Sequence, residues 1–190
     1  MTSTPARHTS MPGDGVDPVD AVGGPGTRGS AVRVLRRLAL FSSGLLAGAF
    51  GYGAVNIVQA FQSVPLDVRL TFHTALMRMN GPVMQSAMGV AFVSALVLAV
   101  LFRARSRMLA AGAGLLTLAT FLITRFGNVP INRQIREWLA GSVPADHAAI
   151  LQRWELLNYL RTGTALTAFV LMLVVVDRTV GTTAGRQVER

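Results

Sequence analysis

The sequence predicts an all-α protein that spans a membrane four times, as a four-helix bundle with additional interfacial helices in its two non-cytoplasmic loops. Three observations lead to this fold class. Of the 190 residues, 51% are hydrophobic and only 14% are charged, whereas soluble domains carry about 25% charged residues. Four long stretches contain no charged side chain, and all 18 basic residues are arginines that gather mostly beside these stretches. A soluble enzyme is therefore not expected.

The charge and the missing cysteines exclude several classes of function. A net charge of +9 would suggest nucleic-acid binding in a soluble chain. Here most arginines flank apolar stretches, so we expect the lipid bilayer as a partner and no nucleic acid. The chain has no cysteine, which excludes disulfides, thiolate metal sites and cysteine nucleophiles. The histidines and carboxylates are few and scattered, so neither a metal site nor a bound cofactor is predicted.

The N-terminal part contains a tail and the first span. Residues 1–30 are predicted to be disordered, since they are rich in Gly, Pro, Ser and Thr and lack an apolar period. Residues 31–180 form the predicted membrane domain, and residues 181–190 a C-terminal tail. The first span covers about residues 38–61, which reach about 36 Å as a helix and can cross a hydrocarbon core of about 30 Å. A secretory signal has an apolar region of only about 7–15 residues.

Three further apolar stretches predict the remaining spans, at about residues 82–102, 108–125 and 161–177. The last two are short, but arginines at their ends can extend to the interface. Small residues four positions apart, such as Gly44 and Gly48, would let helices approach closely, although such residues are common in any membrane helix. Whether the chain forms a homo-oligomer stays open.

The distribution of arginine predicts the orientation, because cytoplasmic loops carry an excess of basic residues. Three arginines precede the first span within residues 33–37, three occupy the loop at residues 103–107, and three more follow the fourth span. We therefore expect a multi-pass protein of the cell membrane with both termini in the cytoplasm. The segments 62–81 and 126–160 then lie on the other side, and their arginines are interpreted as ordinary surface residues.

The segment 65–80 is predicted to be a helix with one apolar face. That face consists of Leu66, Leu70, His73 and Met77, at the spacing of one side of a helix. The Gly-Pro pair at residues 81–82 would break or kink the helix before the second span. His73 is either a packed, hydrogen-bonded residue or a general base, a role that suits an imidazole with an ordinary pKa of about 6.5.

A second non-cytoplasmic helix is predicted after the third span. Pro130 favours a helix start, and Asn128 can cap or turn the chain just before it. Its apolar stripe consists of Ile131, Ile135, Trp138 and Leu139. We expect an amphipathic helix of about ten residues that lies in the membrane interface. Asn132 is near its first turn, where capping alone would explain it.

The next helix is predicted to start around residues 144–146 and to run without interruption into the fourth span. Trp154, Asn158 and Arg161 lie at positions i, i+4 and i+7 of this helix and so share one face. Each alone is typical of a membrane boundary, where Trp is an anchor and Arg extends to the interface. Polar side chains at membrane depth, however, usually face a cavity or the bundle interior. The shared face therefore indicates a candidate site.

Several of these features occur together in one known family. They are the four spans, the motif Asn128-Val-Pro-Ile-Asn132 after the third span, the motif Arg153-Trp154-x3-Asn158-x2-Arg161 before the fourth, and the helix with Phe72 and His73 before the second. Over about residues 38–178 the chain resembles the DUF1772, or anthrone oxygenase-like, membrane proteins. Many of these proteins carry His at the position of Asn158, which leaves His73 as the candidate imidazole here.

The resemblance implies a membrane-embedded oxygenase that converts an anthrone to an anthraquinone without a bound cofactor. Its partners would be a hydrophobic aromatic small molecule from polyketide synthesis and O2. Such a reaction needs a base, a partner for the oxyanion, and a dry pocket with aromatic walls. The implied roles are His73 as base, Arg161 and Asn158 as oxyanion partners, Trp154 as a stacking wall, and Asn128 and Asn132 as orienting donors.

The main alternative is a non-catalytic membrane protein that uses the same residues to bind a hydrophobic ligand or a partner helix. A small transporter or channel is disfavoured. No span interior contains a relay of charged residues, and the sequence has no clear inverted repeat of the kind that transporters show.

Overall fold

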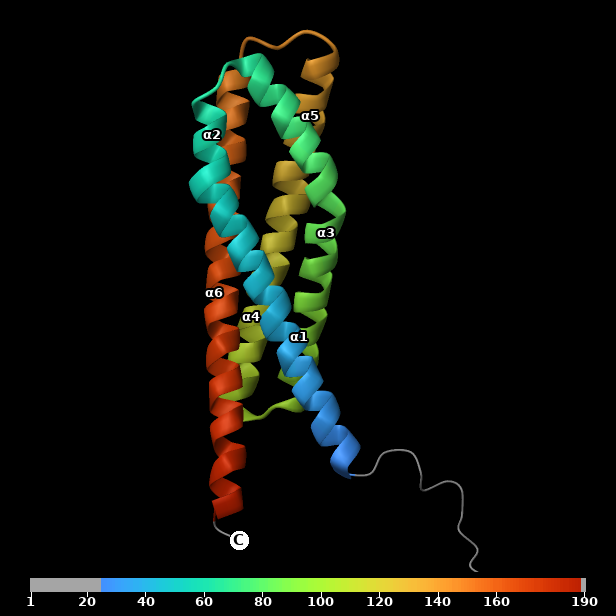
Figure 1. Cartoon of the computed structure of the whole chain (residues 1–190), viewed down its shortest axis with the longest axis vertical. Helices are drawn as coiled ribbons and strands as arrows, with labels where there is room; N and C mark the ends of the chain where they lie inside the picture. Colours follow the sequence, from blue (N-terminus) through green and yellow to red (C-terminus); the bar gives the residue numbers. More distant parts are fainter. Residues whose placement is uncertain (1–24, 189–190) are drawn as a thin grey trace, which may run out of the picture.

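The computed structural model describes residues 25–188, and side chains within residues 29–179. This part of the chain contains helices and short loops but no strand, and its long helices run up and down in turn (Figure 1). The helices are α1 (Pro25–Tyr52), α2 (Val58–Gln62), α3 (Leu66–Leu101), α4 (Ala104–Leu122), α5 (Val129–Ala140) and α6 (His147–Val188). Two π-helical segments, η1 (Gly53–Ile57) and η2 (Ile123–Asn128), join α1 to α2 and α4 to α5.

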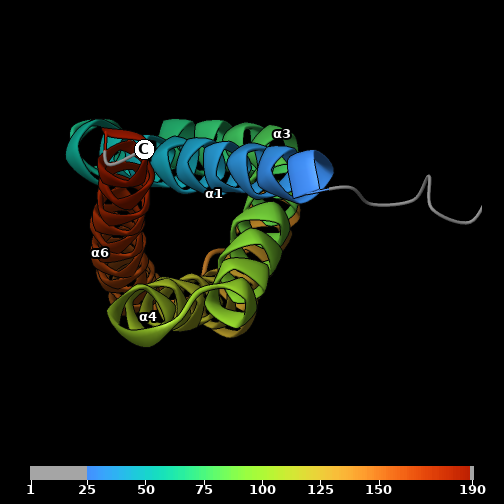
Figure 2. The ribbon, with the colours of Figure 1, turned by 90° about the horizontal axis from the view of Figure 1, so that it is seen from below.

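In the described chain, four continuous helical units are long and apolar enough to cross a membrane. They are Gly29–Gln62, Leu66–Leu101, Ala104–Ala140 and His147–Thr179. Seen along the bundle, these units form a ring in which α1 contacts α3 and α6, while α4 contacts the same two helices on the opposite side (Figure 2). The predicted all-α fold with four membrane-spanning helices is confirmed.

The helix predicted over residues 65–80 continues a spanning helix. It forms the first part of α3, which runs through Gly81 and Pro82 without ending, so of the break or kink predicted there, the break is wrong. Proline removes one backbone donor, but ending the helix in hydrocarbon would leave several more backbone groups unpaired. The helix therefore continues, and a separate interfacial helix is not shown.

The segment 129–140 is also helical, with Pro130 in its first turn as predicted. Asn128 makes no capping hydrogen bond, because the chain enters α5 directly from η2 with helical backbone angles. The residues of α5 that are buried in the bundle are Ile131, Ile135 and Trp138. Leu139, predicted in the same stripe, is 45% exposed. Neighbouring helices therefore bury this stripe, and no separate interfacial helix is shown here either.

The predicted tails overlap the helices in part. Residues 1–24 and 189–190 lie outside the described residues, and with them most of the predicted tail at residues 1–30. α1 begins at Pro25, and α6 begins at His147, close to its predicted start, and continues to Val188. The predicted domain limits stay predictions.

Both described ends of the chain lie at the same end of the bundle as the loop between α3 and α4 (Figure 1). This loop consists of Phe102 and Arg103 alone, and Ala104 adopts a left-handed φ of 49° to complete the turn. Arg36 donates from Nη1 to the Thr179 hydroxyl at 2.9 Å, which ties α1 to α6 at this end. This arginine-rich end is the one predicted to face the cytoplasm, and that orientation stays a prediction.

The buried apolar side chains form three clusters along the bundle. One lies near the described ends of the chain, a second surrounds Phe50 and Met88 halfway along, and a third lies at the opposite end. The third cluster is rich in aromatic rings and packs α2, α3, α5 and α6 together. Its fully or largely buried members are Val58, Phe61, Leu70, Ile131, Ile135, Trp138, Leu151 and Trp154. The candidate site lies between the second and third clusters.

Candidate functional site

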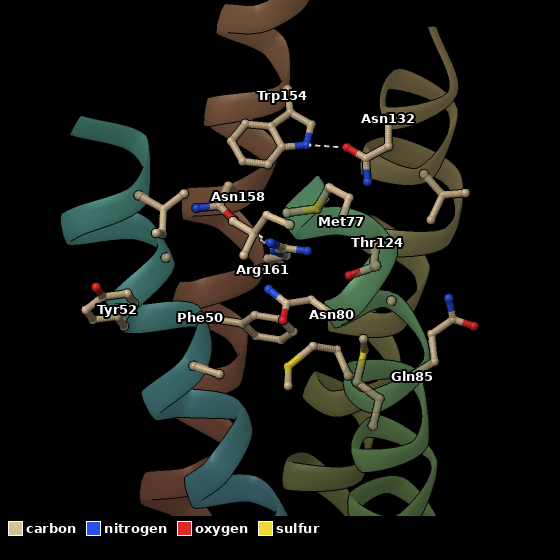
Figure 3. Close-up of a pocket in the computed structure, with 18 residues that line it drawn as sticks. Phe50, Tyr52, Met77, Asn80, Gln85, Thr124, Asn132, Trp154, Asn158 and Arg161 are labelled. Carbon is tan, nitrogen blue, oxygen red and sulfur yellow. Dashed lines mark hydrogen bonds between the residues drawn. The ribbon is translucent and has the colours of Figure 1, made fainter. Parts of the chain in front are cut away.

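A cavity of about 370 Å³ lies inside the bundle, where α1, η1, α3, η2, α5 and α6 meet. Its volume falls within the range of about 300–1,000 Å³ that is usual for small-molecule sites. The residues that line it are Ala49, Phe50, Tyr52, Gly53, Ile57, Leu76, Met77, Asn80, Gly81, Met84, Gln85, Met88, Thr124, Val129, Asn132, Trp154, Asn158 and Arg161. Most of this lining is apolar or aromatic, and a few polar groups converge on it (Figure 3).

Arg161 and Asn158 are held together on α6 at the wall of this cavity. The guanidinium of Arg161 donates from Nε and Nη2 to Asn158 Oδ1, at 3.0 and 2.6 Å. It also lies over the ring of Phe50, 4.5 Å from the ring centroid, in a cation–π contact. The Thr162 hydroxyl donates to the carbonyl of Asn158 and lies 3.1 Å from the carbonyl of Phe50, so that α1 and α6 are in contact here.

The positive charge of Arg161 is not balanced by an acidic side chain. Among the side chains that the structure describes, Arg161 makes no ion pair, and none of those lining the cavity is a carboxylate. Asn158 is 1% exposed, and its Nδ2 has no hydrogen-bond partner within the same residues. A buried donor without a partner costs about 1–3 kcal/mol. The cavity wall therefore holds a cation without a carboxylate partner and, beside it, a buried N–H group without a hydrogen-bond partner, among the described residues.

Trp154, Asn132 and His73 form a hydrogen-bonded group beside the cavity. The indole Nε1 of Trp154 donates to Asn132 Oδ1 at 2.8 Å (Figure 3). His73 Nε2 lies 3.0 Å from the same oxygen. The His73 ring stacks on Phe61, with 5.0 Å between centroids and 16° between planes, and lies 4.5 Å from the Trp154 ring.

The structure brings four of the six sequence-predicted site residues to the cavity wall and leaves two behind it. Trp154, Asn132, Asn158 and Arg161 line the cavity, whereas His73 and Asn128 do not. His73 is 1% exposed and lies behind Trp154. Asn128 donates from Nδ2 to the backbone carbonyl of Trp154 at 3.2 Å, so that it joins η2 to α6.

Other residues of the cavity wall were not identified from the sequence. They include Phe50, Tyr52, Asn80, Gln85 and Thr124. Asn80 and Gln85 gave a usable signal, since they are polar residues at the start of an apolar stretch and polar side chains at membrane depth tend to face a cavity. Phe50 and Tyr52 gave none, because aromatic residues are ordinary members of any membrane span.

The cavity has its mouth between α1 and α3. Three of its lining residues are exposed on the outer surface of the bundle: Tyr52 on α1, which is 62% exposed, and Asn80 and Gln85 on α3. All three belong to helical units that are long and apolar enough to cross a membrane. The mouth therefore opens through the side of the bundle.

An ion pair joins α3 to α6 between the mouth of the cavity and the end of the bundle opposite to the described chain ends. Arg69 Nη2 donates to Glu155 Oε1 at 2.8 Å, and Gln62 donates to the other carboxylate oxygen at the same distance. Arg69 is only 8% exposed, so its interpretation as an ordinary surface residue is wrong. A signal was present in the sequence, because Arg69 lies four residues before His73 and shares its buried helix face.

Gly127 allows η2 to approach α6 closely beside Asn128. A Cβ at this position would lie 2.9 Å from Leu157 Cδ1, whereas a Cβ at Gly48 would meet no atom within 4 Å. We expect Gly127→Ala to be less stable than the matched Gly48→Ala by about 1–2 kcal/mol, since Leu157 must move. Unfolding of both purified variants, followed by circular dichroism in the same detergent, measures the difference. Equal stabilities would contradict the close packing.

A family model covers the part of the chain that forms this site. A model of the anthrone oxygenase family matches residues 68–171, more than half of the chain. The chain belongs to this family. The resemblance predicted from the sequence is thereby confirmed, and the match to the anthrone oxygenase family contains all six predicted site residues. No curated protein and no solved structure matches the chain. Within the described residues, no group of three or more His, Asp and Glu side chains could hold a metal ion.

Proposed function

We propose that this anthrone oxygenase family member uses O2 to oxidise an anthrone-type polycyclic aromatic compound, of the kind made in polyketide synthesis, within the membrane. A single observation about Arg161 carries the proposal. Its guanidinium is a cation that has no carboxylate partner among the described residues, and it lies at the wall of a largely apolar cavity. Membership of the family supports the choice of substrate class and of reaction.

The proposed reaction is balanced without a further reductant. An anthrone has a methylene carbon between two aromatic rings and across the central ring from a carbonyl, so that loss of one methylene proton gives an anion whose charge is shared with the carbonyl oxygen. The anion transfers an electron to O2, and the two radicals combine to form a carbon–oxygen bond. The second methylene proton then leaves, the O–O bond breaks, and water is released. Anthrone and O2 thus yield anthraquinone and water.

Arg161 and Asn158 stabilise the anion that forms in this reaction. The guanidinium and the free Nδ2 of Asn158 bind the oxygen on which the negative charge develops, and fixed donors in surroundings of low dielectric constant are far more effective than water. Favouring the anion makes the methylene proton more acidic. Trp154 and Phe50 provide flat apolar walls for the rings of the substrate. Aromatic side chains of this size contribute strongly to binding.

The proposed route passes the methylene proton to a water molecule within the cavity. None of the described lining side chains is a carboxylate or an imidazole, and a general base must come within about 3 Å of the proton, or reach it through one water. His73, which the sequence suggested as the base, lies one layer behind the wall. Its role in proton removal stays a prediction.

Turnover of a hydroxyanthrone by the purified protein tests the proposal. The full chain in lipid nanodiscs is mixed with an emodin-anthrone-type substrate, and the formation of anthraquinone and the consumption of O2 are followed together. We expect one O2 per anthraquinone formed, at a rate well above that of empty nanodiscs. A rate equal to that of empty nanodiscs would overturn the proposed function.

A non-catalytic binding protein is the second candidate, and the absence of a base among the described lining residues favours it. In that case the same cavity would bind an anionic aromatic ligand without turnover. Titration with the anthraquinone product under anaerobic conditions, followed by quenching of tryptophan fluorescence, measures binding alone. Saturable binding together with no acceleration of oxidation would support this second candidate over the first.

A further inference from the structure

We infer that His73 is a positioning residue of the proposed oxygenase: together with Trp154 it holds the side-chain oxygen of Asn132, so that the Asn132 amide nitrogen serves as a donor to the ligand. The inference rests on the proposed function for the identity of the ligand. It assigns to His73 a role in which the imidazole donates a hydrogen bond and does not accept the substrate proton.

Trp154 sets the orientation of the Asn132 amide. The indole nitrogen of Trp154 can only donate a hydrogen bond. The Asn132 atom that lies 2.8 Å from it must therefore be the oxygen. The amide nitrogen of Asn132 consequently lies on the other side of the group, where it is directed into the space between Trp154 and Thr124 (Figure 3).

The same Asn132 oxygen fixes the tautomer of His73. Its Nε2 lies 3.0 Å from Asn132 Oδ1, and an oxygen that already accepts from Trp154 has no proton to give. Nε2 must therefore carry the hydrogen and donate it. Two donors from different helices, α3 and α6, thus converge on one oxygen of α5. Their convergence restricts rotation of the Asn132 side chain more strongly than either donor could alone.

Neighbouring aromatic rings limit access to the imidazole of His73. Phe61 covers one side of the ring, the Trp154 ring lies 4.5 Å away, and His73 is 1% exposed. Nδ1 is buried without a hydrogen-bond partner among the described residues. His73 is absent from the cavity lining, and Trp154 and Asn132 occupy the wall in front of it. The imidazole ring therefore packs behind the side chains that line the cavity and does not contact a ligand directly.

The consequence for the site is a third donor, on a different helix from the other two. Arg161 and Asn158 present their donors from α6, whereas Asn132 presents Nδ2 from α5 (Figure 3). No described residue accepts a hydrogen bond from this nitrogen, which leaves it free for an oxygen of the ligand. An anthraquinone has carbonyl oxygens on two opposite edges and can accept from both sides of the cavity.

His73→Gln and His73→Ala separate positioning from base catalysis. The amide nitrogen of Gln can take the place of His Nε2 and donate to Asn132, but an amide is not a base. We expect His73→Ala to lower kcat/KM by about 10- to 100-fold, as is typical for loss of a supporting hydrogen bond, and His73→Gln to recover most of that loss. Equal, severe losses of kcat in both variants, with product binding retained, would overturn the inference in favour of a base.

Anaerobic binding of the anthraquinone product tests the same inference without turnover. His73→Ala and Asn132→Leu are each expected to weaken binding, and the double variant is expected to bind no more weakly than Asn132→Leu alone, because both changes remove the same donor. Additive losses would overturn the inference, and so would a His73→Ala variant that binds as wild type does. Because this measurement needs no O2, it stays decisive even if the protein does not oxidise anthrones.

Asn132→Asp provides a test that leaves His73 in place. The carboxylate keeps an acceptor for both His73 and Trp154 but replaces the free donor by a second acceptor. We expect it to weaken product binding at least as much as His73→Ala does. Binding as tight as that of wild type would show that the amide nitrogen does not contact the ligand and would overturn the inference.

Discussion

Replacing Arg161 by methionine is expected to lower kcat/KM for oxidation of a hydroxyanthrone by about 10²- to 10³-fold, the loss typical of removing one oxyanion donor from an enclosed site. Methionine fills a similar volume and keeps the contact with Phe50, but it removes the charge that favours the anion. Wild type and variant are compared in nanodiscs by the rate of anthraquinone formation. Since the lost interaction forms mainly with the anion, kcat should fall more than KM rises.

Arg153→Met is the matched control for this experiment. Arg153 lies on the same helix but is exposed and does not line the cavity, so its loss should leave the rate within about twofold of wild type, as for other surface substitutions. Arg161→Lys should recover only part of the activity, because an ammonium group cannot present two parallel donors as a guanidinium does. If Arg161→Met and Arg153→Met had equal rates, Arg161 would have no part in the reaction.

Replacing Glu155 by alanine is expected to lower the free energy of unfolding by about 3 kcal/mol, which is typical of breaking a buried ion pair from one side. The side chains of Arg69 and Glu155 are only 10% and 12% exposed, so the remaining guanidinium would keep its charge in a poorly solvated place. Gln62 would lose its acceptor as well. Equilibrium unfolding of both proteins in the same detergent, followed by tryptophan fluorescence, measures the change.

Two comparisons make the result specific to the pair. Glu137→Ala removes an exposed carboxylate and should change stability by no more than about 0.5 kcal/mol. Replacing both Arg69 and Glu155 by methionine removes the two charges together and should recover most of the loss, because no unpaired charge then stays buried. A double variant as unstable as Glu155→Ala would indicate that packing, and not the unpaired charge, sets the cost.

The spans could be predicted because hydrocarbon imposes a simple requirement on sequence. A helix that crosses it needs about 20 residues without charge, and such stretches are visible without a structure. A break at Gly81 and Pro82, one of the two outcomes predicted there, does not occur. Local rules for helix ends assume that water can receive the freed backbone groups. Hydrocarbon contains no water to do so, and α3 continues. The same reasoning explains why Asn128 joins η2 to α6 instead of capping a new helix.

The candidate site could be predicted on α6 but only in part elsewhere. The spacing of Trp154, Asn158 and Arg161 places them on one face, and that face lines the cavity. Helical spacing gives the direction of a side chain but not its depth, so the same reasoning could not tell that His73 lies behind Trp154. The aromatic side chains of α1 were not found either, since the composition of an apolar span does not distinguish lipid-facing residues from cavity-facing ones.

The mouth between α1 and α3 has a consequence for how rates should be measured. A ligand that reaches the cavity through the side of the bundle comes from the bilayer, where a hydrophobic anthrone is concentrated far above its level in water. Its effective concentration is then the mole fraction in lipid. Adding empty vesicles at a fixed total amount of substrate should dilute that mole fraction and raise the apparent KM, while kcat stays constant. An apparent KM that does not depend on the amount of lipid would place the approach of the ligand on the aqueous side.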